Sequence, residues 1–279
     1  MRFEDVAERR AAEAPYLSAL ARDHVRHTAF HGITHPSLGN YIGLISGQTP
    51  SALDRRNCPS YPACVRPGPT IVEQLEERGL TWRGYFESMP RACARPSGSI
   101  DEYQVGYATR HNPFVYFQGI VGDEEYCRSH VVPLDPHWAI DLKSTAPSFA
   151  LIVPDTCNDG HDANCKPNRT RLQVFDEWLK DRVPPILEFL DHHPRSALFI
   201  TFDESEGSDA AACCGETSGS GGGHIDLVMV APGLERAPGH RVTEPANLYS
   251  LLRTLQDAFG LAPLGRAKDV APITDLFTR

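Results

Sequence analysis

The chain has 279 residues, of which 41% are hydrophobic, so it is long enough for one large domain with a substantial core. Its 36 acidic and 27 basic residues give a formal net charge of −9, and no basic run stands out. This balance argues against nucleic acid as a partner and against charge-driven docking on anionic lipid. No stretch approaches the ~18 apolar residues of a membrane span, so we expect no stable membrane anchor.

Helices and strands alternate along the chain. In chain order we expect helices at 4–23, 37–46 and 70–79, a strand at 81–89, an irregular segment at 91–145, a strand at 148–155, a helix at 170–190 that a Pro-Pro pair interrupts, strands at 196–205 and 224–234, and a helix at 245–261. The last three strands are continuous apolar runs, as in strands buried on both faces. The pattern predicts a single α/β domain over residues 1–279, with a mainly parallel sheet between layers of helices.

Polar residues follow the ends of these strands, where ligand sites lie in such folds. Asp155 ends one strand, Asp203 and Glu204 end the next, and the polar loop 205–223 leads to His224. Adjacent carboxylates at a buried strand end repel each other, and a bound cation would offset the repulsion. The alternative is a pair of solvated loop acids. For His224, a ligand or phosphate contact is weighed against an ordinary structural histidine.

The segment PDTCNDGHD (154–162) places several oxygen and nitrogen donors close together in sequence. Such mixed donors suit Mg, Mn, Ca or Zn better than a soft metal. The candidate donors are Asp155, Asn158, Asp159, His161 and Asp162. The alternative is a polar turn held by a Cys157–Cys165 bridge.

Ser37 stands where a helix is expected to begin, within an uncharged, glycine-rich stretch. A serine there is commonly a helix cap. The alternative is a nucleophile that a cation activates, with the helix N-terminus and Asn40, one turn on, binding the phosphoryl oxygens.

Eight cysteines indicate disulfides and therefore an oxidising compartment, although the N-terminal segment carries no secretion signal. We expect the pairs Cys58–Cys64, Cys93–Cys127 and Cys157–Cys165, and we assign no partner to Cys213 and Cys214. The alternative is eight unrelated thiols in a cytosolic enzyme.

The segment THPSLGNYIGLISG (34–47) resembles the nucleophile segment of the alkaline phosphatase superfamily. More closely, it resembles the bacterial phosphoesterase family of acid phosphatases and phospholipases C. The similarity continues in order through RHNPFVYF (110–117), VVPLD (131–135), PDTCNDGHD (154–162), TFDE (201–204), HIDLVMVAPG (224–233) and YSLLRTLQDAFGL (249–261). The chain is most similar to the secreted acid phosphatase branch that includes phosphatidylinositol-3-phosphate phosphatases.

This resemblance implies an alkaline phosphatase-like three-layer sandwich and a divalent metal ion. Ser37 would be the nucleophile and, with Asp203, Glu204, Asp155 and Asp159, a metal ligand. The other implied catalytic residues are Asn40, His111 and His224, and the implied substrate-binding residues are His35, Asn112 and His161.

The implied activity is metal-dependent hydrolysis of a phosphoric monoester, either a small ester or a phosphoinositide, through a phosphoserine. One alternative is a phospholipase C-like phosphodiesterase, and another is a binding protein that retains the fold without the chemistry. A secreted or extracytoplasmic location is expected. The resemblance implies no oligomeric state.

Three departures from the family pattern stand out. Gly39 replaces the usual proline, and Leu248 replaces a frequent histidine. The family also opens with a strand and a Glu-Asn pair of metal ligands, whereas this sequence starts just after that position. We therefore expect a domain truncated at its N-terminus, lacking its first, central strand and part of its metal site, and unstable or nearly inactive as given.

Overall fold

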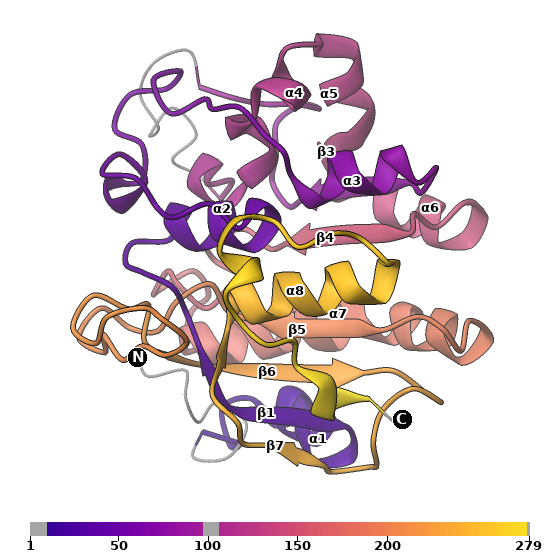
Figure 1. The fold of residues 1–279 in the computed structure, drawn as a ribbon. Helices are drawn as coiled ribbons and strands as arrows, with labels where there is room; N and C mark the ends of the chain where they lie inside the picture. Colours follow the sequence, from indigo (N-terminus) through magenta and orange to yellow (C-terminus); the bar gives the residue numbers. More distant parts are fainter. Residues whose placement is uncertain (1–9, 97–105, 278–279) are drawn as a thin grey trace.

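The strands form two separate sheets, which Figure 1 shows one above the other. The computed structural model describes residues 10–96 and 106–277. The larger sheet has the order β5–β6–β1–β7, and β8 also pairs with β1. Its strands are β1 (Val25–His31), β5 (Leu198–Thr201), β6 (His224–Val230), β7 (Arg241–Val242) and β8 (Ala246–Asn247). The smaller sheet has the order β3–β2–β4, with β2 (Trp82–Phe86), β3 (Val131–Pro133) and β4 (Phe149–Val153).

The two sheets differ in strand direction. The smaller sheet is entirely parallel, whereas in the larger sheet β6 runs antiparallel to both β1 and β5. No pairing joins β4 to β5 within the described ranges. The single sheet expected from the sequence is therefore found in two parts among the described residues.

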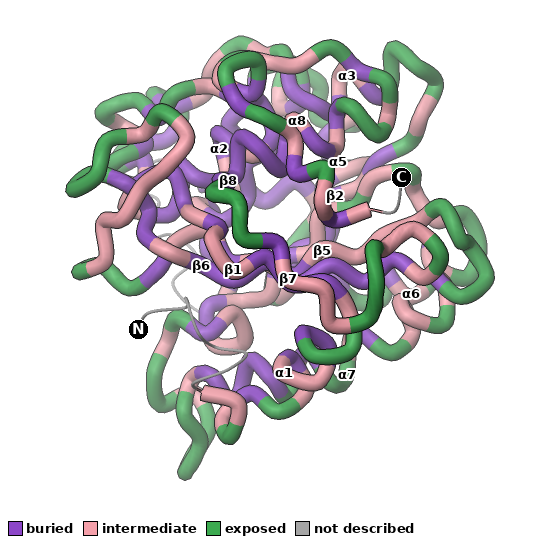
Figure 2. The backbone as a smooth tube through the Cα atoms, turned by 60° about the horizontal axis from the view of Figure 1, so that its bottom comes forward, coloured by how far each residue is buried: buried purple, intermediate pink, exposed green. Residues whose placement is uncertain are grey.

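Helices cover both faces of the sheets and complete a three-layer sandwich. Figure 2 shows α1 (Pro15–Asp23) and α7 (Arg171–His192) on one side, and α2 (Leu38–Ser46), α3 (Ile71–Glu77) and α8 (Leu248–Phe259) on the other. The remaining helices are α4 (Gln118–Val121), α5 (Glu124–His130) and α6 (His137–Ser144), with short 3-10 turns at Asp54–Arg56, Thr109–His111, Pro113–Tyr116, Gly265–Lys268 and Thr274–Leu276.

Two helices differ from their predicted form. The first begins at Pro15 instead of within 4–14, because proline favours the first turn of a helix and disfavours helical geometry in the residue before it. Residues 4–9 of that prediction lie outside the described residues. The Pro184–Pro185 pair does not interrupt α7, which runs unbroken over 22 residues from a capping box between Thr170 and Gln173.

Disulfides close several of the loops. The three expected bridges are present, namely Cys58–Cys64, Cys93–Cys127 and Cys157–Cys165. A fourth, which the sequence did not predict, joins the neighbours Cys213 and Cys214. In the part of the chain that the structure describes, no helix is long and apolar enough to cross a membrane.

Candidate active site

The segments that follow β1, β4 and β5 converge on one cavity of about 390 Å³. Ser37 enters it from the turn between β1 and α2, Asp159 from the loop after β4, and Asp203 and Glu204 from the end of β5. This is the position that an α/β fold gives to its ligand sites. The strand-end residues singled out in the sequence thus meet in one place, although not all of them enter the cavity.

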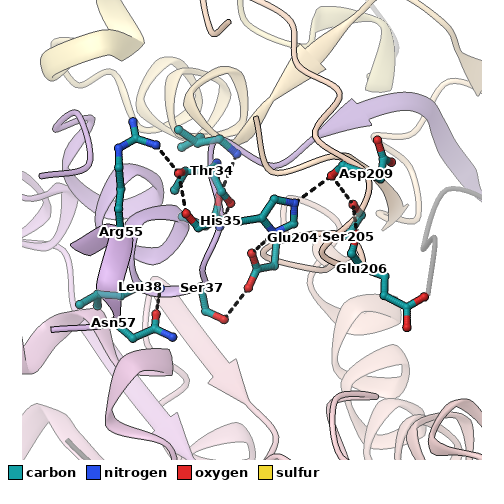
Figure 3. Close-up of polar contacts among 12 residues, drawn as sticks. Thr34, His35, Ser37, Leu38, Arg55, Asn57, Glu204, Ser205, Glu206 and Asp209 are labelled. Carbon is teal, nitrogen blue, oxygen red and sulfur yellow. Dashed lines mark hydrogen bonds and ion pairs between the residues drawn. The ribbon is translucent and has the colours of Figure 1, made fainter. Parts of the chain in front are cut away.

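Ser37 lies immediately before α2 and is only 4% exposed. Its hydroxyl makes no capping bond among the described residues, so the ordinary helix-cap role is not what holds it. Instead it donates a hydrogen bond of 2.8 Å to Oε1 of Glu204, as Figure 3 shows. The serine proton therefore points at a carboxylate that is able to accept it.

His35 fixes the other oxygen of that carboxylate. Its Nδ1 contacts Oε2 of Glu204, and its Nε2 lies 2.8 Å from the backbone carbonyl of Asp209 (Figure 3). A carbonyl oxygen only accepts hydrogen bonds, so Nε2 carries a proton, and a carboxylate favours a proton on Nδ1 as well. The hydrogen bond to Glu204 raises the pKa of His35, against the opposing effect of burial. The family resemblance implies a substrate-binding role for His35, and in the structure its ring contacts Glu204 and the Asp209 carbonyl.

Asp203 is the strongest candidate cation ligand. Burial, and then the charge of neighbouring Glu204, raise the pKa of its carboxyl group above the usual value. Its Oδ2 atom is shielded from solvent and has no hydrogen-bond partner among the residues that the structure describes. A shielded, unpaired carboxylate oxygen beside a second carboxylate costs free energy that a bound cation would offset. Asp203 is therefore not a solvated loop acid.

The donor set fits a hard divalent cation. The oxygens of Asp203, Glu204 and Ser37 are the kind of ligand that Mg²⁺, Mn²⁺ or Ca²⁺ prefers. Among the described residues, Asp162, Cys157 and Cys165 form another group whose potential ligand atoms lie close to one another. Those two cysteines form a disulfide, and a coordinating cysteine must be a thiolate, so that group does not compete.

Asp159 and His111 form a second polar pair in the same cavity. Asp159 Oδ2 lies 3.4 Å from His111 Nδ1. Burial raises the pKa of Asp159 well above its usual value and lowers that of His111 well below its own. Both shifts favour the uncharged forms, a protonated Asp159 and a neutral His111.

Three predicted site residues do not reach the cavity. The carboxylate of Asp155 accepts the N–H groups of Cys157 and Asn158 and the hydroxyl of Ser88, so it holds a turn. The other two are Asn112, whose amide donates to the Tyr107 hydroxyl and accepts the Phe114 N–H, and His224, whose Nε2 contacts the Thr28 carbonyl.

Asn40 and His161 border the cavity, and each side chain already interacts with other residues. Asn40 accepts the N–H groups of Ile33 and Thr34 and donates to the Thr34 carbonyl, which leaves one amide hydrogen for a phosphoryl oxygen. His161 lies at the rim with its side chain 58% exposed and paired with Asp162.

The sequence of residues 6–262 matches the model of the phosphoesterase family. The chain belongs to that family. A probable acid phosphatase of Kluyveromyces lactis is 30% identical over 200 residues, which cover 71% of this chain and 44% of the relative. A phosphatidylinositol-3-phosphatase of Mycobacterium tuberculosis is 25% identical over 264 residues, covering 95% of this chain and 76% of the relative. The chain thus spans less than half of the first relative's length.

Solved structures show the same fold at low sequence identity. A protein of the alkaline phosphatase superfamily from Vibrio parahaemolyticus superposes with a TM-score of 0.53 at 12% identity, over 90% of this chain and 61% of the other. A lipoteichoic acid synthase from Listeria monocytogenes gives 0.51 at 11% identity, over 94% and 70%. This phosphoesterase-family chain therefore has the alkaline phosphatase-like fold expected from its sequence.

Two of the departures from the family pattern, Gly39 and Leu248, lie within the described residues, at the cavity or beside it. A Cβ atom at Gly39 would lie 2.6 Å from Thr34 Cγ2 and 2.9 Å from Pro50 Cβ, so these two side chains would have to shift to admit a proline. Leu248 lines the cavity with an apolar side chain where a histidine is frequent in the family. The leucine makes this wall of the cavity less polar than a histidine would.

The sequence analysis did not predict two residues of the cavity, Tyr41 and Arg171. Tyr41 stacks on His111 with ring centroids 5.4 Å apart, and burial followed by the charge of Asp203 raises the pKa of its phenol. It follows Ser37 by four positions, a spacing that places both on one helix face. Arg171, at the start of α7, lines the rim and forms a 2.6 Å ion pair with Glu206. No motif pointed to it.

Proposed function

We propose that the protein hydrolyses phosphoric monoesters with Ser37 as nucleophile and a divalent cation as cofactor. The observation that carries this proposal is the 2.8 Å hydrogen bond from the buried Ser37 hydroxyl to Glu204, in a cavity that also holds the unpaired Oδ2 of Asp203. The names of the acid phosphatase and phosphatidylinositol-3-phosphatase relatives support the same reaction class.

The residues present can perform the proton transfers of a two-step reaction. In the first step the bond from Ser37 Oγ to phosphorus forms, the ester P–O bond breaks, and the serine proton passes to Glu204 Oε1. The leaving alkoxide takes up a proton, for which buried Asp159 is placed as donor because its raised pKa favours the protonated form. In the second step water attacks phosphorus and the bond to Ser37 Oγ breaks. Glu204 returns its proton to Ser37 Oγ, and Asp159 takes up the proton that the water releases.

Asp203, Glu204 and Ser37 would hold the cation, whereas Asp159, in the same cavity, would act as proton donor instead of as a ligand. When bound, it would lower the pKa of the serine hydroxyl and offset charge on the phosphoryl oxygens. The one free amide hydrogen of Asn40 would bind a phosphoryl oxygen. Helix α2, which begins directly after Ser37, also directs the positive end of its dipole toward that position.

We infer a small phosphate ester or a phosphoinositide headgroup as substrate, and an oxidising, extracytoplasmic location. The four disulfides support the location, because they persist where thiols are not kept reduced. The mycobacterial relative supports a phosphoinositide by its name alone.

The test compares turnover of p-nitrophenyl phosphate and bis(p-nitrophenyl) phosphate, with and without EDTA, for wild type, Ser37→Ala and the control Ser46→Ala. Ser46 is also buried on α2, but its hydroxyl bonds the Ile42 carbonyl and lies away from the cavity. The readout is the ratio of turnover between each variant and the wild type. We expect at least about a thousandfold loss for Ser37→Ala and little change for Ser46→Ala.

Preference for the diester would replace the monoesterase with the phosphodiesterase alternative. Full activity of Ser37→Ala would exclude the proposed nucleophile. If the wild type turned over neither substrate with every divalent cation tested, the result would favour a binding protein.

A further inference from the structure

Helix α2 begins without a capping bond from the residue that precedes it. The first N–H groups of a helix have no partner inside the helix, and the side chain before the helix normally accepts one of them. Ser37 occupies that position, but its backbone is already helical (φ −44°, ψ −51°) and its hydroxyl caps no N–H among the described residues. The hydroxyl bonds Glu204 instead. The start of α2 therefore needs an acceptor from elsewhere in the chain.

Asn57 supplies this acceptor from a loop that follows α2. Its Oδ1 accepts the backbone N–H of Leu38 at 3.0 Å, across 19 positions of sequence. Figure 3 shows Asn57 on one side of Ser37 and Glu204 on the other. Asn57 thus takes the capping role that a serine at the start of a helix commonly has, and the serine hydroxyl stays available to Glu204.

Several bonds fix the turn that carries Asn57, residues 54–57, which we name the capping turn. Asn57 has a left-handed backbone (φ +52°), which asparagine adopts more readily than most residues, and its N–H donates to the Asp54 carbonyl at 2.9 Å. The carboxylate of Asp54 is fully buried and forms an ion pair with Arg66. A disulfide joins the next residue, Cys58, to Cys64. The Asn57 amide is therefore presented to α2 by a turn that has little freedom to move.

The capping turn also contacts the other end of the segment that carries Ser37. Arg55 donates through Nη1 to the hydroxyl of Thr34, as Figure 3 shows. Thr34 is joined in turn to Asn40 of α2, because its N–H donates to Oδ1 at 3.1 Å and its carbonyl accepts Nδ2 at 2.8 Å. The capping turn therefore holds the turn around Ser37 at its beginning and at its end.

We propose that Asn57 is a positioning residue, which caps α2 in place of Ser37 and so keeps the serine hydroxyl on Glu204. Without the Asn57 amide, the uncapped N–H groups would attract the Ser37 hydroxyl, the usual capping group at this position, and would draw it away from the carboxylate. Asn57 affects turnover only if Ser37 is the nucleophile, as in the proposed function, whereas the cap itself requires no catalysis.

The first experiment measures kcat and KM for p-nitrophenyl phosphate in wild type, Asn57→Gly and Asn57→Asp. Glycine removes the amide and suits the left-handed backbone, so the capping turn is not strained, and aspartate keeps an oxygen that is able to accept the Leu38 N–H. We expect Asn57→Gly to lower kcat by at least about tenfold with a smaller change in KM, since it removes no substrate contact. The kcat of Asn57→Asp should lie closer to that of wild type than to that of Asn57→Gly.

Asp123→Ala is the matched control for the loss of a helix cap. The Asp123 side chain caps α5 by accepting the N–H groups of Glu125 and Tyr126, and no described residue of α5 lines the cavity. This variant loses a cap of the same kind at a distance from Ser37. It should therefore leave kcat unchanged.

The second experiment follows the exchange of caps without any substrate. Melting temperatures are compared for Asn57→Gly in the wild-type and Ser37→Ala backgrounds. In the wild-type background the Ser37 hydroxyl is able to replace the lost cap, whereas alanine offers no acceptor. The drop in melting temperature should therefore be larger in the Ser37→Ala background, by about 2 °C or more. Other effects of the glycine are common to both backgrounds and cancel in the comparison.

The outcomes separate this proposal from the proposed function. Unchanged kcat in Asn57→Gly, with Ser37→Ala inactive, would overturn the positioning role and leave the nucleophile in place. Full activity of Ser37→Ala would instead refute the proposed function, and the melting temperatures would still test the cap. Equal losses of kcat in both Asn57 variants, or equal drops in melting temperature in both backgrounds, would overturn the exchange of caps.

Discussion

Acidification should destabilise this fold through His27, which is buried on β1 in its neutral form. The residue is fully buried, and its Nδ1 accepts the backbone N–H of Ala29 at 3.2 Å. Its Nε2 finds no hydrogen-bond partner anywhere in the described ranges. Burial, followed by the nearby His31 and His224, lowers the pKa of His27 from 6.5 to about 4.

The sign and size of the effect follow from proton linkage. The unfolded chain binds a proton at His27 as the pH falls through 6.5, whereas the folded chain does so only at about 4. Stability is therefore highest above pH 6.5, falls between these values, and is independent of His27 below them. The shift corresponds to a loss of about 3 kcal/mol, a large part of the ~5–15 kcal/mol that stabilises an ordinary domain.

The assay is urea unfolding at neutral pH and near pH 4 for wild type, His27→Gln and the control His193→Gln. Glutamine does not titrate and is able to accept the Ala29 N–H, so the loss on acidification should shrink by about 3 kcal/mol. His193 is exposed and should leave that loss unchanged. An equal loss in wild type and His27→Gln would refute the reasoning.

Three further outcomes are expected. Asp226→Asn should lower the free energy of unfolding, measured in urea, by about 3–5 kcal/mol. The reason is that Arg26, which lies 2.6 Å away and is equally buried, keeps its charge. A change below about 1 kcal/mol, the net contribution of one ordinary hydrogen bond, would show that the pair is not needed. Replacing Cys93 and Cys127 together by alanine opens a 34-residue loop and should cost about 4 kcal/mol, measured by thermal unfolding against the oxidised wild type. Glu204→Gln should weaken Mn²⁺ binding in calorimetry, since it removes a carboxylate charge beside Asp203. Unchanged binding would exclude this residue as a ligand.

Apolar runs predicted the later strands well, and the first strand escaped for a physical reason. β4, β5 and β6 lie within the predicted strands at 148–155, 196–205 and 224–234. β1 reads VRHTAFH, which carries an arginine and two histidines and has no clear apolar pattern. It is nevertheless largely buried, because Asp226 neutralises Arg26 and the histidines stay neutral. Such long-range pairing is not visible in a local pattern.

The site shows a similar division. The convergence of Ser37, Asp203 and Glu204 follows from motifs at a helix start and a strand end. The contact of His35 with Glu204 joins positions 169 residues apart, so no spacing could predict it. For Asp155 the sequence left a metal ligand and a polar turn open, because sequence does not reveal when local N–H groups already occupy a carboxylate.

The most direct test of the central claim is a rapid acid quench during turnover of p-nitrophenyl phosphate, followed by peptide mass spectrometry. The proposed function predicts one phosphoryl group on the peptide that contains Ser37, present in wild type and absent from Ser37→Ala. Turnover by wild type with that peptide unmodified and another residue phosphorylated, or undiminished turnover by Ser37→Ala, would contradict it.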